Sequence, residues 1–196
     1  MIQLVEGAYC WSAFNPEKKF NFNGHMIKTA EGTVIVDPVA FSAADLAYIE
    51  TAGLVPDALV ITNRNHLRER DAVLKRWKIP TVLHALEADS AGVVPEHSVA
   101  DGERMHGLVC VHLPGKSPGE IALYWPERRL FLLGDALIAP YGKLRTVPVE
   151  KQEAPAELKK SLERLRTFDF DHLLVGDGDP LLGDAKSAVV AFLNRP

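Results

Sequence analysis

The chain has 196 residues, of which 47% are hydrophobic and 24% charged, so it carries enough apolar material for one core of ordinary size. Its 22 basic and 26 acidic residues give a formal net charge of -4, which argues against the one-sided positive surface that nucleic acids need. The apolar runs are too short to span a bilayer, and the first residues lack the pattern of a signal peptide. We therefore expect a single cytoplasmic domain over residues 1–196 that binds neither nucleic acid nor membrane.

The first half is predicted to contain strands and helices in the order β, β, β, α, β, α, β. Apolar and β-branched runs predict strands over residues 2–5, 26–28, 33–36, 58–61 and 81–84. Ser42 followed by Asp45 is typical of a helix start, and this helix should end before Gly53. A second helix is expected over residues 69–78, where Pro80 prevents its continuation.

The second half begins with strands and ends with helices. Its strands are expected at residues 108–112, 121–125, 130–133 and 173–175. Pro155 opens one helix, and Asp179-Pro180 is interpreted as the cap of a final helix that ends near Leu193. Residues 86–103 are interpreted as surface loop and short edge strands. The pattern favours a layered α/β or α+β domain with its strands inside and its helices outside.

Polar loops follow several of these strands. Asp37 stands at the exit of the third strand, and residues 62–68 (Thr-Asn-Arg-Asn-His-Leu-Arg) follow the fourth. The later loops are Gly115-Lys116-Ser117-Pro118-Gly119, Gly134-Asp135 and Gly176-Asp177-Gly178. Their order resembles that of the metallo-β-lactamase-fold superfamily, whose metal-binding loops occupy these positions. The resemblance spans most of the chain and implies a four-layer αββα sandwich and a hydrolase-like activity.

The loops depart from the family at the metal-ligand positions. In the ungapped register, the family's four ligands in the first motif are replaced by Asn63, Asn65, Leu67 and Arg68. A shift by two residues lets Asn65-His66 stand for an Asp-His pair, and both registers stay open.

Two further ligand positions have also changed. Lys116 replaces the histidine of the third loop, and Asp177 replaces the histidine of the late loop. Zinc requires imidazole, thiolate or carboxylate donors, whereas an ammonium or guanidinium group is a donor-only cation that repels it. We therefore expect no dinuclear zinc centre and no other cofactor, with a single divalent metal at Asp135, Asp177 and His66 as a lesser alternative.

The substituted residues suggest that charge pairing replaces the metals. Lys116 and Arg68 can supply positive charge opposite Asp135 and Asp177 and keep both carboxylates ionised. Such a network either fills a former cavity or forms a cationic pocket for an anionic group. The two interpretations are left open.

The candidate site residues fall into two groups. Those assigned to catalysis are Lys116, His66 and Asp135, and those assigned to substrate binding are Asn63, Asn65, Arg68 and Asp177. In the first hypothesis the catalytic group positions or activates a water molecule in a hydrolase relative without its dizinc centre. The alternative is a non-catalytic binding or interaction protein, and a mononuclear metal-dependent hydrolase is the lesser one. Whether the protein is an enzyme stays open.

The expected partner is a small-molecule substrate or ligand, which the positive groups suggest is anionic. The aromatic residues of segment 11–23 have three interpretations: a flap over the site, core packing, or a homodimer contact. They are Trp11, Phe14, Phe20 and Phe22.

Overall fold

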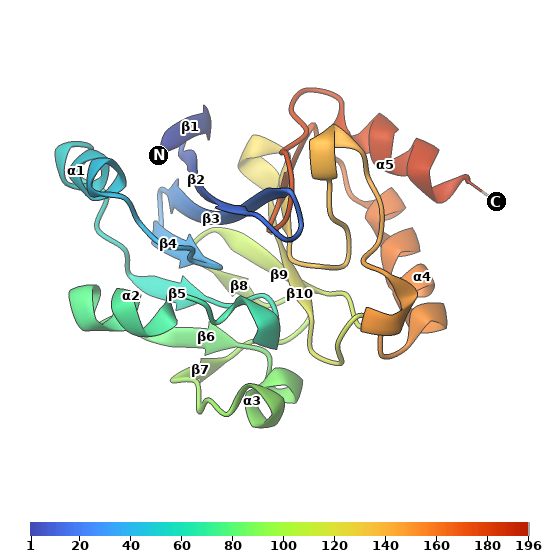
Figure 1. The fold of residues 1–196 in the computed structure, drawn as a ribbon, viewed down its shortest axis with the longest axis horizontal. Coiled ribbons are helices and arrows are strands. Elements are labelled where there is room, and N and C mark those ends of the chain that lie inside the picture. The colour runs from blue at the N-terminus through green and yellow to red at the C-terminus, as the bar shows by residue number, and fades with distance from the viewer. Residues whose placement is uncertain (196) are drawn as a thin grey trace.

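The computed structural model describes residues 1–195 and contains two β-sheets that lie between two groups of helices (Figure 1). The N-terminal sheet consists, in order, of β1 (Ile2–Val5), β2 (Ala8–Asn15), β3 (Phe20–Thr29), β4 (Gly32–Val36), β5 (Ala58–Val60), β6 (Thr81–Leu83) and β7 (His97–Ser98). The first four strands pair antiparallel, and β4 to β7 pair parallel.

The C-terminal sheet has the order β12 (His172–Val175), β11 (Leu130–Leu133), β10 (Ile121–Trp125), β9 (Leu108–His112) and β8 (Arg104–Met105). β11 and β12 pair parallel, so their carboxyl ends open at the same edge of the sheet. The strands expected at residues 108–112, 121–125 and 130–133 are confirmed to the residue.

Alternating side chains along the strands divide the interior into three apolar layers. Val34 and Val36 face the C-terminal sheet, whereas Ile35 points the other way, toward the helices. The N-terminal sheet is covered by α1 (Ala43–Thr51), α2 (Arg70–Trp77) and α3 (Ala85–Ala91), and the C-terminal sheet by α4 (Pro155–Glu163) and α5 (Ala185–Leu193). This is the αββα sandwich expected from the sequence.

The beginning of α1 follows the predicted capping pattern. The Asp45 backbone N–H donates to the Ser42 hydroxyl at 3.1 Å, and the Asp45 carboxylate accepts from the Ser42 backbone N–H at 2.8 Å. No helix among residues 1–195 is long and apolar enough to cross a bilayer.

Two element predictions were wrong, and one strand had not been predicted. Residues 8–15 form a full strand, β2, and residues 85–91 form α3 rather than loop. The last helix begins at Ala185 instead of following Asp179-Pro180. Leu181 exchanges two backbone hydrogen bonds with Leu173 of β12, so this segment extends the sheet contacts before the helix begins.

The aromatic segment 11–23 belongs mainly to the core. Trp11 is buried, its indole N–H donates to the Val39 carbonyl at 2.9 Å, and its ring stacks on Phe41. Phe14 remains exposed, whereas Phe22 reaches the candidate site described below. Core packing therefore explains Trp11, and the structure assigns no flap role to it.

Candidate functional site

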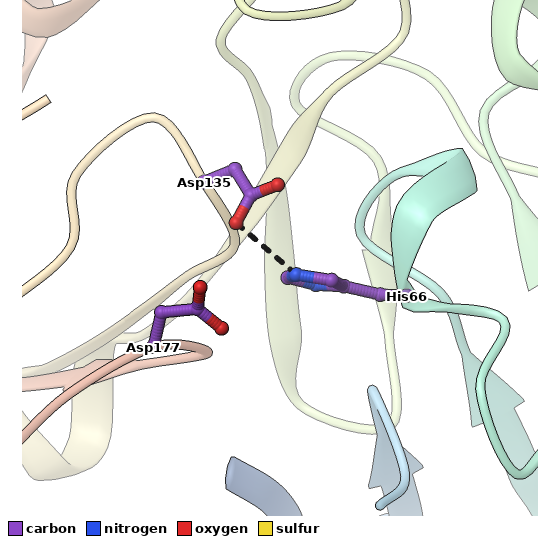
Figure 2. A group of neighbouring side chains, drawn as sticks. All are labelled: His66, Asp135 and Asp177. Carbon is purple, nitrogen blue, oxygen red and sulfur yellow. Dashed lines mark hydrogen bonds and ion pairs between the residues drawn. The ribbon is translucent and has the colours of Figure 1, made fainter. Parts of the chain in front are cut away.

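The candidate site lies where loops from both sheets meet at the carboxyl ends of their parallel strands. His66 ends a one-turn 3₁₀ helix, Arg64–His66, that follows β5. Asp135 follows β11, and Asp177 follows β12. Figure 2 shows these three side chains approaching one another from separate segments. One ligand-type atom from each lies within 4.8 Å of those of the other two.

His66 is held between two carboxylates. Its ring Nδ1 lies 2.7 Å from Asp37 Oδ2, and its Nε2 lies 3.1 Å from Asp135 Oδ1 (Figure 2 draws the second contact). Burial alone would lower the pKa of His66, but the charges of Asp37 and Asp135 raise it to about 10. The ring is therefore an imidazolium at neutral pH and donates one N–H hydrogen bond to each carboxylate.

Asp37 is turned into the site by its backbone. Its φ of 47° lies in the left-handed region, which aspartate tolerates better than most residues. Its carboxylate accepts the Thr62 backbone N–H at 2.8 Å and the Thr62 hydroxyl. Burial opposes ionisation of Asp37, but His66 and the Thr62 hydrogen bonds lower its pKa below the usual value.

Lys116 occupies the space between Asp135 and the loop after β5. Its ammonium lies 2.9 Å from Asp135 Oδ2 and 3.3 Å from Asn63 Oδ1, with 5% of the residue exposed. Burial would raise the pKa of Asp135, but the His66 and Lys116 cations lower it well below its usual range. Both oxygens of Asp135 are thus engaged by cations.

Two glycines allow the loops around Lys116 to approach their neighbours. A Cβ on Gly115 would lie 2.2 Å from the Leu158 backbone nitrogen, and its φ of 130° disfavours any other residue. A Cβ on Gly134 would lie 2.4 Å from the Thr62 hydroxyl oxygen. The close approach of α4 therefore requires glycine at Gly115, and the close approach of the loop after β5 requires glycine at Gly134.

Arg68 pairs with the third carboxylate. Its guanidinium lies 3.0 Å from Asp177 Oδ1 and stacks over the Phe22 ring at 4.6 Å. Burial and the nearby charge of Asp135 raise the pKa of Asp177 despite the opposing effect of Arg68. Asp177 is accordingly the most easily protonated of the three aspartates.

Glu120 lies behind Asp135, on the loop before β10. It is fully buried, and one of its oxygens accepts the backbone N–H groups of Asp135 and Ala136. Its other oxygen has no hydrogen-bond partner within residues 1–195. Burial and the charge of Asp135 raise the pKa of Glu120 well above its ordinary value.

A cavity of about 190 Å³ opens in front of these ion pairs. Its walls include six of the seven residues predicted from the sequence: His66, Lys116, Asp135, Asn65, Arg68 and Asp177. Asn63, the seventh, lies beside it through the contact with Lys116. The cavity walls also contain Lys18, Lys151, Phe22 and Val147, which carry no motif in the sequence.

Sequence reasoning missed several polar neighbours. Asp37 was recognised at a strand exit but not as the partner of His66, and Thr62 was seen only as the start of a motif. Lys18 and Lys151 are isolated lysines whose approach depends on the fold, so no local signal marks them. Among the other histidines, His25 is fully buried, with no hydrogen-bond partner within residues 1–195.

Comparison with known proteins gives a consistent picture. Residues 5–193 match the family model described as the metallo-beta-lactamase superfamily. The chain is 22% identical to the "Probable metallo-hydrolase YflN" of Bacillus subtilis (strain 168), over 81% of this chain and 83% of that protein. It is 28% identical to the "Probable metallo-hydrolase YqgX" of the same organism, over 59% of this chain and 65% of that protein.

Solved structures show the same fold. The metallo-beta-lactamase from Pontibacter korlensis superposes with a TM-score of 0.80 at 16% identity, over 98% of this chain and 95% of that one. TTHA1623, crystallised in a di-iron-bound form, superposes with a TM-score of 0.71 at 26% identity, over 89% of this chain and 94% of that one.

Proposed function

Because the chain belongs to the metallo-beta-lactamase superfamily, we propose that it is a hydrolase-like protein in which ion pairs replace the metal pair and the cavity holds a small anionic ligand. The position of Lys116 is the observation that carries the proposal. Its ammonium contacts Asp135 and Asn63, two residues at positions where the family resemblance implies metal ligands.

The donor set does not fit a pair of zinc ions. A lysine ammonium has three donors and no lone pair, so it repels a metal cation at the distance where a ligand is needed. His66, which contacts Asp37 and Asp135 in the metal-free site, could bind a metal only as neutral imidazole. Metal binding would require both groups to lose a proton.

The charges of the site balance without a metal. Three carboxylates of the site each face at least one cation within hydrogen-bond distance, whereas the buried Glu120 has none within residues 1–195. The carboxylates are Asp37, Asp135 and Asp177, and the cations are His66, Lys116 and Arg68. Removing one member of such a buried pair would leave its partner as an uncompensated buried charge, which is strongly destabilising. The ion pairs therefore stabilise the packing of the loops from both sheets that carry these residues.

The metal content of the purified protein tests the first part of this proposal. Protein prepared without added metal or chelator should contain far less than one zinc, iron or manganese ion per chain by mass spectrometry. A stoichiometric metal in that sample would refute the proposal.

Hydrolysis is tested by a screen of ester, thioester, lactone and phosphodiester substrates. If the site is catalytic through Lys116, Lys116→Ala should lose about a hundredfold or more of the parent rate. Lys160→Ala, which removes an exposed lysine from α4, is the matched control. Equal rates for Lys116→Ala and the parent would exclude Lys116 from catalysis, and no turnover by any of the three proteins would favour the non-catalytic binding protein.

A single-metal hydrolase is the second candidate. It is favoured by the grouping of His66, Asp135 and Asp177, whose ligand-type atoms lie within 4.8 Å of one another. Those residues would hold a divalent ion, which would activate a bound water for attack on the substrate. In that case added zinc or manganese should raise the melting temperature of the parent but not of Asp177→Asn.

A further inference from the structure

The cavity is lined by more cationic side chains than its carboxylates pair with. Besides the His66 imidazolium, which Asp37 and Asp135 hold, four lysine and arginine side chains line the cavity: Lys18, Arg68, Lys116 and Lys151. Lys116 is matched by Asp135 at 2.9 Å, and Arg68 by Asp177 at 3.0 Å. Within residues 1–195, neither Lys18 nor Lys151 has a carboxylate within 4.0 Å.

Lys18 is held over the cavity by a braced turn between β2 and β3. The Asn15 side chain accepts the backbone N–H of Glu17 at 3.0 Å and that of Lys18 at 2.9 Å. The Tyr141 hydroxyl donates to the Lys19 carbonyl at 2.6 Å. The backbone that carries Lys18 is thus anchored from both sides.

Lys151 is attached to the other wall. It ends a one-turn 3₁₀ helix, Val149–Lys151, and its backbone N–H donates to the Pro148 carbonyl at 2.9 Å. Two residues later, the Glu153 backbone N–H donates to the carbonyl of Lys116 at 3.2 Å. The segment of Lys151 is therefore joined directly to the loop that carries Lys116, another residue of the cavity wall.

The fold places both lysines on the wall of one cavity. The side chain and charge of Lys18 lower the pKa of Lys151 below its ordinary value. Two ammonium groups in this arrangement repel one another, and an anion placed between them removes the repulsion and gains hydrogen bonds from both. Phe22 and Val147 supply apolar wall beside this position.

We propose that Lys18 and Lys151 form a phosphate-binding mouth and that the ligand is a small phosphate monoester whose organic part enters the cavity. The inference rests on the proposed function, because it names the anion that the metal-free cavity holds. A phosphate monoester carries between one and two negative charges at neutral pH and several acceptor oxygens on one compact group, which matches two ammonium groups without carboxylate partners that line the same cavity. A carboxylate carries one charge. The cavity volume of about 190 Å³ restricts the inserted part to a small molecule.

Binding of phenyl phosphate, with benzoate as the single-charge analogue, tests the proposal by calorimetry at low and constant ionic strength. The parent should bind phenyl phosphate saturably and more tightly than benzoate. The variant Lys18→Ala/Lys151→Ala should bind phenyl phosphate at least about tenfold more weakly. Its matched control is Lys143→Ala/Lys160→Ala, which removes the same charge from exposed positions outside the cavity and should bind like the parent.

Three results would overturn the inference: no saturable binding by the parent, equal affinity of parent and Lys18→Ala/Lys151→Ala, or equal affinity for benzoate and phenyl phosphate. The metal content of the same samples separates this failure from failure of the proposed function. If the protein is metal-free but does not bind phenyl phosphate, the phosphate-binding mouth is refuted and the proposed function is not. In metal-loaded protein, phosphate held by the metal would be released by chelator and unaffected by the lysine substitutions, which would refute both.

Discussion

Single side chains decide the charge of this site. The sequence indicated that Lys116 and Arg68 would face Asp135 and Asp177, and the structure places Lys116 against Asp135 and Arg68 against Asp177. It did not indicate how His66 is used. A histidine after a strand can be a base, a ligand or a packed residue, and here its two carboxylate contacts make it a cation.

The protonation of His66 predicts a pH-dependent stability. Its pKa is about 10 in the folded protein against 6.5 for an ordinary histidine, so the folded state retains a proton that the unfolded state loses. The stabilisation is complete below pH 6.5 and is lost as the pH rises toward 10. From pH 7 to pH 9, the free energy of unfolding should therefore fall by about 2 kcal/mol.

Urea unfolding in buffer with EDTA measures this loss without interference from metal. In His66→Gln the free energy of unfolding should change much less between pH 7 and pH 9 than in the parent. In His97→Gln, at an exposed histidine, it should fall as in the parent. A parent protein whose unfolding free energy is constant over this range would show that His66 is neutral in the folded state.

At the scale of elements, α3 has a role that its local sequence did not reveal. Residues 86–103 were expected to be surface loop and short edge strands. The helix places Glu87, fully buried, between two loops of the site. Its carboxylate accepts the Arg64 backbone N–H at 3.0 Å and the Gly119 backbone N–H at 2.8 Å. Long-range hydrogen bonds of this kind stabilise a short helix that propensity alone would not predict.

Glu87→Gln should loosen both loops at once. The amide keeps one acceptor but turns its NH₂ group toward a backbone donor, so we expect a loss of about 2 kcal/mol in the free energy of unfolding. Urea unfolding measures the loss, and hydrogen exchange at the amides of Arg64 and Gly119 should be faster. Asp89→Asn, on the exposed face of the same helix, should leave both unchanged. If exchange is faster in the control as well, the effect belongs to the helix and not to Glu87.

At the scale of the whole molecule, the site depends on how the two sheets meet. Asn23 of β3 donates from its amide to the carbonyls of Val175 at 2.9 Å and Gly178 at 2.7 Å. Its backbone N–H also donates to the Gly176 carbonyl at 2.8 Å. The loop that carries Asp177 is therefore fastened to the N-terminal sheet by a buried amide.

Asn23→Ala should separate this loop from the sheet. Two buried carbonyls would lose their donor, at an expected cost of about 2 kcal/mol in the free energy of unfolding. Asn21→Ala, on the same strand but without a side-chain hydrogen bond among the described contacts, should change it by less than about 0.5 kcal/mol. Comparable losses in chemical denaturation of the two variants would contradict the role of Asn23.

The sequence by itself determined the layered fold and most of the strands, because these are local properties of periodicity, turn residues and residue type. Only the tertiary structure decided which cation meets which carboxylate and that Lys18 and Lys151 share one cavity. The physical reason is distance along the chain. Arg68 and Asp177 are 109 residues apart, and Asn23 and Val175 are 152 apart, so their contacts exist only after the two sheets have packed face to face.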